Sequence, residues 1–344
     1  MPSPARLFVD LDALAANFHT LTRVAGAPVH PVVKADGYGL GAAAVARRLL
    51  AEGADTFFVA RVGGGEALRK AVGSKPIIYV LDGCGPKDVL RLQASQLRPV
   101  LSSLEQIKRW LGSDGGPCGL HIDTGMNRLG VRPEEAPEPF AGLEMVVSHL
   151  ACADEPGHPM NRAQRAAFEL AARKYPGTVR SFANSGGVFL GPDFIFDAVR
   201  PGVCLYGGGP EGRPDERIRP VARFTADILQ VRDLLAGETV GYGRTFEADR
   251  PMMVATVAAG YADGVLRSWS PRGRVFVGGE LRPVVGRISM DLMCVDVTGL
   301  EVTAGDTVEL FGPNHPVDVA ASEAGTIAYE LLTSVSPRVP RVYV

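Results

Sequence analysis

The first two thirds of this 344-residue chain alternate short apolar runs with amphipathic segments, and this alternation restricts the fold more than any other feature. Runs such as TFFVA and PIIYVL are rich in β-branched residues and often follow Pro or Gly, which is typical of buried strands. Segments between them, such as GAAAVARRLLAEGA, have the pattern of amphipathic helices. The apolar runs occupy residues 31–35, 56–60, 76–81, 97–102, 119–123, 144–150, 179–185 and 197–202.

Strand–helix units in succession predict an α/β fold, a parallel (β/α)8 barrel of the TIM type. An open doubly wound sheet is the alternative, although it usually has fewer strands. From about Arg219 the chain changes to strand-like runs with Gly-rich turns, which predicts a β-rich C-terminal domain. We expect residues 1–9 to contain a strand that joins the C-terminal domain, residues 10–217 to form the barrel, and residues 218–344 to form the β-rich domain.

Composition excludes several classes of protein. The net charge of −2 argues against nucleic acid or an anionic membrane surface as a partner. No uncharged apolar run approaches the ~18 residues of a membrane span. Five cysteines occur singly, without a CxxC pair, and the histidines lack ligand spacing, so we expect no metal and a reducing compartment. The expected location is therefore the cytoplasm.

Polar residues fall where the predicted strands end. Lys34 closes the first strand, Arg128 follows the fifth, His149 closes the sixth, Ser185 ends the seventh, and Arg200 lies in the eighth. The carboxyl ends of parallel barrel strands meet at one face, where functional side chains gather. These residues therefore predict one convergent site.

Lys34 has two interpretations. Its stem follows three apolar residues, so its amine is expected at the barrel mouth, where most lysines pair with a carboxylate. A Schiff-base lysine is the alternative, and it needs a confined, partly desolvated amine. The Gly-rich segment that follows permits close approach of a ligand, and Tyr38 within it can offer a hydroxyl to a phosphate.

The segment VVKADGYGLG resembles the cofactor-lysine signature of the alanine racemase family, in which the lysine carries pyridoxal phosphate. The resemblance continues in family order through DTGMNRLG, SHLACADE, ANSGG, RPGVCLYG, VGYGRTF, GYADG, GRISMD and TIAYE. These motifs cover both predicted domains. The resemblance implies a barrel followed by a β-domain, pyridoxal 5'-phosphate bound covalently to Lys34, and interconversion of L-alanine and D-alanine.

The same resemblance implies roles for individual residues. Arg200 would donate to the pyridine nitrogen, and because an arginine stays protonated, that nitrogen would remain unprotonated. His149 would lie against the pyridine ring. The phosphate would be held by Ser185, Tyr38 and the backbone amides of Gly202 and Val203.

Racemisation needs two proton-transfer groups on opposite faces of Cα, and the resemblance assigns Lys34 and Tyr261 to these roles. Arg128 would lie beside the substrate carboxylate, and the backbone amide of Met290 would meet that carboxylate. Tyr261 and Met290 would come from the other subunit, so the resemblance implies a homodimer with shared active sites.

Two positions depart from the commonest family pattern. His121 stands where many members have a carbamylated lysine that holds the arginine of the DTG motif. Pro337 stands where many members have a tyrosine that contacts the phosphate and narrows the entrance. Neither position is a proton-transfer group, so we expect the chemistry to survive.

Alternatives remain at the level of substrate and activity. A serine or broad-spectrum racemase would share these motifs, since a pocket discriminates one methylene or hydroxyl by only ~1–3 kcal/mol. Barrel decarboxylases place a carboxylate at the pyridine nitrogen, which Arg200 disfavours. A non-catalytic pyridoxal-phosphate-binding carrier protein would lack the second-domain Tyr261. The cellular role is either D-alanine biosynthesis as a peptidoglycan precursor or alanine breakdown.

Overall fold

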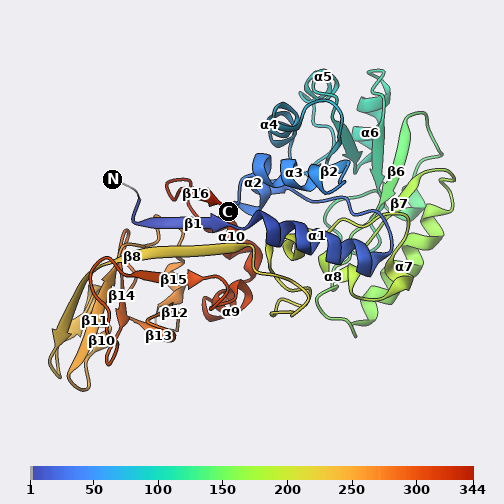
Figure 1. Cartoon of the computed structure of the whole chain (residues 1–344). Helices are drawn as coiled ribbons and strands as arrows, with labels where there is room; N and C mark the ends of the chain where they lie inside the picture. The colour runs from blue at the N-terminus through green and yellow to red at the C-terminus, as the bar shows by residue number, and fades with distance from the viewer. Residues whose placement is uncertain (1–2, 271) are drawn as a thin grey trace. The chain divides into compact units, whose positions relative to one another are not determined.

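The computed structural model describes residues 3–270 and 272–344 (Figure 1). Contacts divide the chain into two units. The N-terminal unit comprises Leu14–Leu205 and Gly209–Glu211, and the C-terminal unit comprises the chain up to Ala13, Tyr206–Gly208 and Gly212–Val344. Residues 10–13, 206–208 and 212–217, which were expected in the barrel, have their contacts mainly with the C-terminal unit.

Six parallel strands form the sheet of the N-terminal unit, in chain order. They are β2 (Thr56–Val59), β3 (Ile77–Val80), β4 (Arg98–Leu101), β5 (Cys118–His121), β6 (Leu143–Val147) and β7 (Val179–Ser181). The β2 strand is buried at every residue, as expected for a parallel strand that is covered on both faces. The helices are α1 (Leu11–Ala25), which starts in the C-terminal unit, α2 (Lys34–Tyr38), α3 (Ala42–Ala51), α4 (Val62–Val72), α5 (Val89–Ala94), α6 (Leu104–Leu111), α7 (Pro159–Ala172) and α8 (Ser185–Val188).

The prediction of a parallel barrel is confirmed in part. The described strands form a parallel half-barrel of six strands, where eight were expected. The segments 31–35 and 197–202, which were predicted as strands, are not regular strands. They make only isolated parallel bridges, between Val32 and Phe58, Val29 and Val199, and Ala198 and Ser181. Proline cannot donate to a ladder, and Pro31 and Pro201 lie in these two segments.

The C-terminal unit is built on an antiparallel sheet. Its order is β11-β14-β13-β12-β15-β8-β1-β16, and β8 pairs with β11 as well as β15, so six of the strands close on themselves. The strands are β1 (Ala5–Val9), β8 (Ala222–Leu234), β11 (Met252–Val257), β12 (Arg274–Val277), β13 (Glu280–Val285), β14 (Met293–Asp296), β15 (Thr307–Phe311) and β16 (Arg341–Tyr343), with β9 (Thr239–Val240) and β10 (Phe246–Glu247) as a separate pair. Two helices, α9 (Val317–Glu323) and α10 (Ala328–Ser334), complete the unit.

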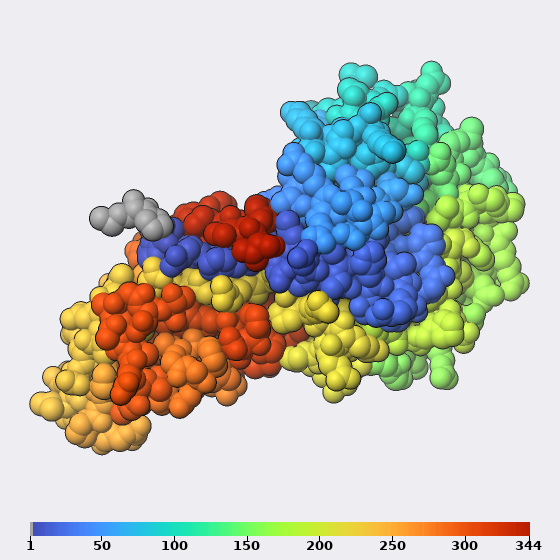
Figure 2. Space-filling model, viewed as in Figure 1, coloured from blue at the N-terminus to red at the C-terminus, as the bar shows by residue number. Residues whose placement is uncertain are grey.

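The first strand of the chain belongs to this sheet. β1 pairs antiparallel with β8 and parallel with β16. Figure 2 shows the blue N-terminal segment lying against the red C-terminal segment. The two ends of the chain therefore pair in one sheet. Among the described residues, every helix is too short or too polar to cross a bilayer.

Aromatic packing holds α7 to the N-terminal unit. Phe168 is fully buried, with ring-centroid distances of 5.1 Å to Phe182 and 5.0 Å to Phe196. We predict that Phe168→Ala lowers the free energy of unfolding by about 3–5 kcal/mol, because it leaves a cavity among these rings. Urea unfolding measures this change. Leu170→Ala is the control on the same helix, since Leu170 is 70% exposed; equal effects of the two changes would contradict this packing.

Candidate active site

The parallel topology brings the predicted residues to one end of the N-terminal unit. Each follows or ends a strand or bridge: Lys34 after the Val32 bridge, His121 at the end of β5, His149 after β6, Ser185 after β7, and Arg200 after the Val199 bridge. The carboxyl ends of neighbouring parallel strands lie at the same edge. The structure therefore brings together residues that are far apart in the sequence.

Arg200 is a buried cation at this end of the unit. Its Nη1 donates to Ser181 Oγ at 2.7 Å, its Nη2 donates to the Ser148 carbonyl at 2.5 Å, and its guanidinium lies 5.8 Å from the Phe58 ring centre. Burial lowers the pKa of Arg200 to about 10, which leaves it protonated at neutral pH. Two of its five N–H donors are used in these bonds, so an acceptor of a ligand can take another.

The two histidines of the site are neutral at physiological pH. Burial and the charge of Arg200 lower the pKa of His121 to about 4. Burial lowers the pKa of His149 well below its ordinary value, and the charges of Arg200, Arg128 and Lys34 add to this effect. Coulombic effects of this kind fall off with distance, so these side chains belong to one site.

Lys34 has the environment of a reactive amine. Burial first, and then the positive charge of Arg128, lower the pKa of Lys34, while Asp82 opposes them. A lower pKa leaves more of the amine neutral and able to attack a carbonyl carbon. A cavity of about 580 Å³ opens beside it, with small side chains such as Ala42 and Ala60 in its lining.

Ser185 organises the corner expected to bind phosphate. Its Oγ accepts from the backbone N–H of Gly202 at 2.9 Å and of Cys204 at 3.2 Å, so its own hydroxyl proton is available to an anion. The Gly202 amide therefore lies at this corner, and its role as a phosphate donor stays a prediction. Tyr38 is buried, and a Cβ added to Gly202 would lie 2.0 Å from the Tyr38 hydroxyl. Only glycine permits this approach.

Arg128 lies on an exposed turn after β5. The turn is held by Asp123, whose Oδ1 accepts from the backbone N–H groups of Gly125 and Met126, each at 2.9 Å. Asn127, directly before Arg128, has a left-handed φ of 55°. These contacts fix the backbone of the turn that carries Arg128.

Three residues of this environment escaped the sequence prediction. Ser148 and Ser181 hold Arg200, and Asp82 acts on Lys34. Each lies at or just after the carboxyl end of a strand, so the rule that identified Lys34 could have found them. Their residue types, however, are common in loops and carry little signal alone.

Tyr261 and Met290 lie in the C-terminal unit, on two segments that run together. The Tyr261 N–H donates to the Ser289 carbonyl at 3.0 Å, and the Ala262 N–H donates to the Met290 carbonyl at 2.9 Å. Tyr261 is 45% exposed and Met290 is 55% exposed. The two side chains therefore share a surface on which they are accessible.

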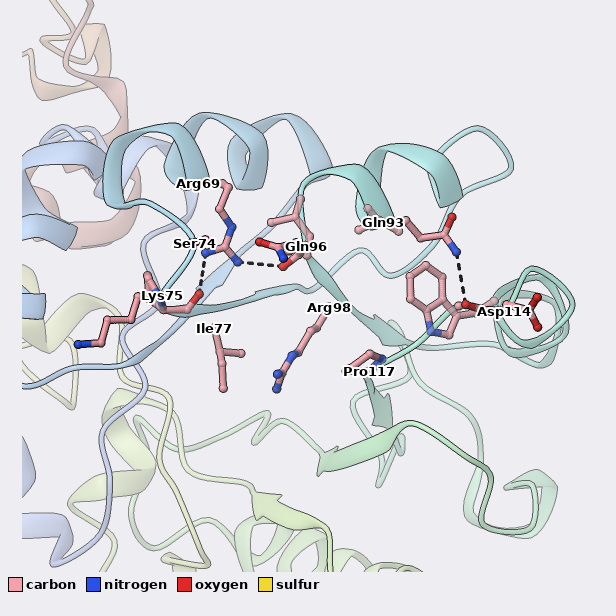
Figure 3. Close-up of a pocket in the computed structure, with 14 residues that line it drawn as sticks. Arg69, Ser74, Lys75, Ile77, Gln93, Gln96, Arg98, Asp114 and Pro117 are labelled. Atoms are coloured by element: carbon pink, nitrogen blue, oxygen red, sulfur yellow. Dashed lines mark hydrogen bonds between the residues drawn. The ribbon is translucent and has the colours of Figure 1, made fainter.

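Another cavity, of about 510 Å³, lies at the amino ends of the strands, where Ile77 begins β3 and Arg98 begins β4 (Figure 3). The Arg69 side chain there donates to the carbonyls of Gly73, Pro76, Ser95 and Gln96. These hydrogen bonds from the Arg69 guanidinium hold in place the loops around the cavity. We assign this end of the unit to stability rather than catalysis.

The donor set at the carboxyl ends fits pyridoxal phosphate. An aldehyde needs a partly neutral amine, as at Lys34; a ring nitrogen needs a donor, as at Arg200; and a phosphate needs hydroxyl donors, as at Ser185 and Tyr38. The Coulombic partners of this site are mainly cations, which suits a dianionic ligand.

The lowered pKa of His121 leads to a testable prediction about stability in acid. Its ordinary pKa of 6.5 falls to about 4 on folding. Between these values the unfolded chain binds the proton and the folded chain does not, so the free energy of unfolding falls as the pH falls. Between pH 6.5 and pH 5, protonation of this one group in the unfolded chain lowers the free energy of unfolding by about 2 kcal/mol. Urea unfolding at pH 7 and pH 5 should show that His121→Gln loses less stability than the unchanged chain.

The unchanged chain, measured at both pH values, is the reference for that experiment. Equal acid sensitivity of His121→Gln and the unchanged chain would show that folding does not depress the pKa of His121.

Comparisons with known proteins agree with this geometry. Family models described as the N-terminal and C-terminal domains of alanine racemase match residues 9–210 and 221–343. An alanine racemase of Acidiphilium cryptum is 45% identical and covers 98% of each chain, and a catabolic alanine racemase of Mesorhizobium japonicum is 45% identical over 99% of this chain and 93% of its own.

Solved structures give the same result. The alanine racemase of Bartonella henselae, crystallised with covalently bound pyridoxal phosphate, matches with a TM-score of 0.94 and 37% identity over all of both chains. The biosynthetic alanine racemase of Pseudomonas aeruginosa matches with a TM-score of 0.92 and 35% identity over 99% of each chain. Two family domains in sequence, full-length relatives and a shared fold lead to one conclusion: the chain belongs to the alanine racemase family.

Proposed function

We propose that this protein is a pyridoxal-phosphate-dependent alanine racemase that interconverts L-alanine and D-alanine. The observation that carries the proposal is the gathering of Lys34, Arg200, His149 and Ser185 at the carboxyl ends of the parallel strands, in a chain of this family. Lys34 is the residue to which we assign the covalent link to the cofactor.

Pyridoxal phosphate, when bound, supplies an electron sink that makes the Cα proton of an amino acid removable. In our assignment Arg200 donates to the ring nitrogen, Ser185 and Tyr38 bind the phosphate, and His149 lies against the ring. The neutral state of His149 suits this contact, because it adds no charge beside the Arg200 cation. Val203 is buried beside the Gly202–Ser185 bond, which supports a role for its amide at the phosphate.

Inversion at Cα requires a proton to leave one face and another to arrive on the opposite face. We assign the Lys34 Nζ to one face and the Tyr261 Oη to the other. The lowered pKa of Lys34 favours its action as a base. A phenol is a weak acid in water, and nearby cations such as Arg128 would stabilise its anion. We assign Arg128 and the Met290 amide to the substrate carboxylate.

We also infer that the isolated bridges complete an eight-stranded barrel. The bridges link Phe58 on β2 to Val32, Val29 to Val199, and Ala198 to Ser181 on β7, which is the order that a closed ring requires. In this interpretation the part of residues 10–217 that forms the N-terminal unit is the cofactor-binding barrel, and residues 218–344, joined by the strand in residues 1–9, supply the second base.

A homodimer follows from the assignment of Tyr261 and Met290 to the active site of the other subunit. The exposure of both residues supports the assignment, since a second copy would cover them. Leu292 and Tyr242, which are also exposed in the same unit, add apolar surface. A two-fold dimer presents the same surface twice, so each dimer would have two shared sites.

We further propose a cytoplasmic, biosynthetic role, in which D-alanine is supplied as a peptidoglycan precursor. The free state of all five cysteines supports a reducing compartment. Full-length relatives include both a biosynthetic and a catabolic enzyme. D-alanine auxotrophy of a deletion strain would support the biosynthetic role, and normal growth would argue for the catabolic one.

A racemisation assay tests the function directly. The purified protein with pyridoxal phosphate should convert L-alanine and D-alanine to the same equimolar mixture, and L-serine and larger amino acids should turn over more slowly. Preferred turnover of serine would reassign the substrate, and no turnover of any amino acid would favour a cofactor carrier.

We predict that Tyr261→Phe suppresses racemisation by at least ~100-fold while the cofactor stays bound, because the variant lacks one of two proton-transfer groups. Turnover and the visible absorption of the bound cofactor are measured on the same sample. Near-normal turnover from both enantiomers would exclude the two-base assignment.

Mixing two inactive variants tests whether the sites are shared. In a mixed dimer of Lys34→Ala and Tyr261→Phe subunits, a shared site would combine the intact Lys34 of one with the intact Tyr261 of the other. Random exchange would make about half of the dimers mixed, each with one intact site, so about one quarter of the unmodified activity should return. No recovery after proven subunit exchange would place both residues in one chain.

A further inference from the structure

The segment that carries Tyr261 and the segment that carries Met290 form a junction in the C-terminal unit. Besides the two backbone hydrogen bonds between them, the junction has very close packing at Gly260. A Cβ added to Gly260 would lie 2.3 Å from the Met290 carbonyl oxygen, so only glycine allows this approach. A small change in either segment would therefore move both Tyr261 and Met290.

Arg338 joins the two segments from a third. Its Nε donates to Asp263 Oδ1 at 2.7 Å, and its Nη2 donates to Asp291 Oδ1 at 2.8 Å. Asp263 lies two residues after Tyr261, and Asp291 directly follows Met290. The Ser336 N–H also donates to the Asp263 carbonyl at 3.0 Å, which fixes the third segment to the first.

The Asp263 carboxylate has two functions in this junction. While Oδ1 accepts from Arg338, Oδ2 accepts from the Gly260 N–H at 2.9 Å, closing the turn that presents Tyr261. The Asp263 side chain is only 9% exposed, so it needs the Arg338 cation as compensation. Asp291, in contrast, is exposed, and its pair with Arg338 acts mainly by holding position.

We propose that Arg338 is a positioning residue for racemisation, which holds the Tyr261 hydroxyl and the Met290 amide at a fixed spacing by bridging Asp263 and Asp291. This inference rests on the proposed roles of Tyr261 and Met290. One arm of the bridge sets the turn that presents the base, and the other sets the segment whose amide meets the substrate carboxylate.

The two arms should have separable kinetic effects. Asp263→Asn weakens the arm beside Tyr261 and should lower kcat more than it raises KM, because proton transfer depends on the place of the base. Asp291→Asn weakens the arm beside Met290 and should raise KM more than it lowers kcat, because the carboxylate contact contributes to binding.

The central experiment uses Arg338→Gln in the cofactor-loaded protein. A displaced base should lower kcat/KM on the order of 10- to 100-fold. The two alanine enantiomers have equal free energies, so kcat/KM must fall equally in both directions. The informative readout is the isotope effect with Cα-deuterated alanine. It should rise for the enantiomer whose Cα proton Tyr261 removes and fall for the other, since transfer at Tyr261 becomes the slower step.

Arg274→Gln is the matched control. Arg274 lies in the same unit, pairs with the Glu323 carboxylate through two side-chain nitrogens, and is 46% exposed, against 45% for Arg338. It should leave the isotope effects unchanged even if it lowers stability. If Arg338→Gln does not fold, Asp291→Asn, which removes only the exposed carboxylate, provides the test through its rise in KM.

The outcomes separate this inference from the proposed function. Loss of activity in Arg338→Gln with unchanged isotope effects for both enantiomers would overturn the positioning role, because a smaller folded fraction alters turnover but not an isotope effect. An unchanged KM in Asp291→Asn would overturn the Met290 arm. An unmodified protein that racemises nothing would instead overturn the proposed function.

Discussion

The burial of the Arg200 guanidinium is the interaction on which the rest of the site depends. A charge removed from water is tolerated only with partners, and Ser181 and the Ser148 carbonyl supply them from the ends of two strands. Burial first, and then the same charge, lower the pKa of His121 and His149, so both imidazoles remain neutral beside it. The site therefore combines cationic side chains with neutral imidazoles, and this combination favours an anionic ligand.

This electrostatic arrangement connects the fold to the proposed chemistry. Burial and the charge of Arg128 lower the pKa of Lys34, which favours a neutral, nucleophilic amine. The phosphate of the cofactor and the carboxylate of the substrate would add negative charge to a site whose charged groups are mainly cations. The neutral His121 fits this view, because Asp123 holds the Arg128 turn without a carbamate.

Much of the fold could be predicted from the sequence, because buried parallel strands are short apolar runs between amphipathic helices. The six strands from Thr56 to Ser181 lie within or next to predicted runs. The first and last runs were not regular strands, since Pro31 and Pro201 limit their ladders and Lys34 starts α2. A short apolar run has the same local pattern whether or not its strand ladder is interrupted in this way.

The site was less predictable from residues alone. The strand-end rule located Lys34 and Arg200, but the roles of Tyr261 and Met290 came only from family resemblance. The engagement of the Gly202 amide by Ser185 depends on a contact between segments 17 residues apart. No pattern in the sequence indicates that Arg338 meets Asp263 and Asp291, because those contacts join residues 75 and 47 positions apart.

The most direct test of the assigned role of Lys34 is to locate the cofactor on the chain. Borohydride reduction of the protein loaded with pyridoxal phosphate makes a lysine link permanent, and peptide mass spectrometry then identifies the lysine. We expect stoichiometric modification of Lys34 and none at the other five lysines of the chain. Stoichiometric modification at another lysine, with Lys34 unmodified, would contradict the assigned role.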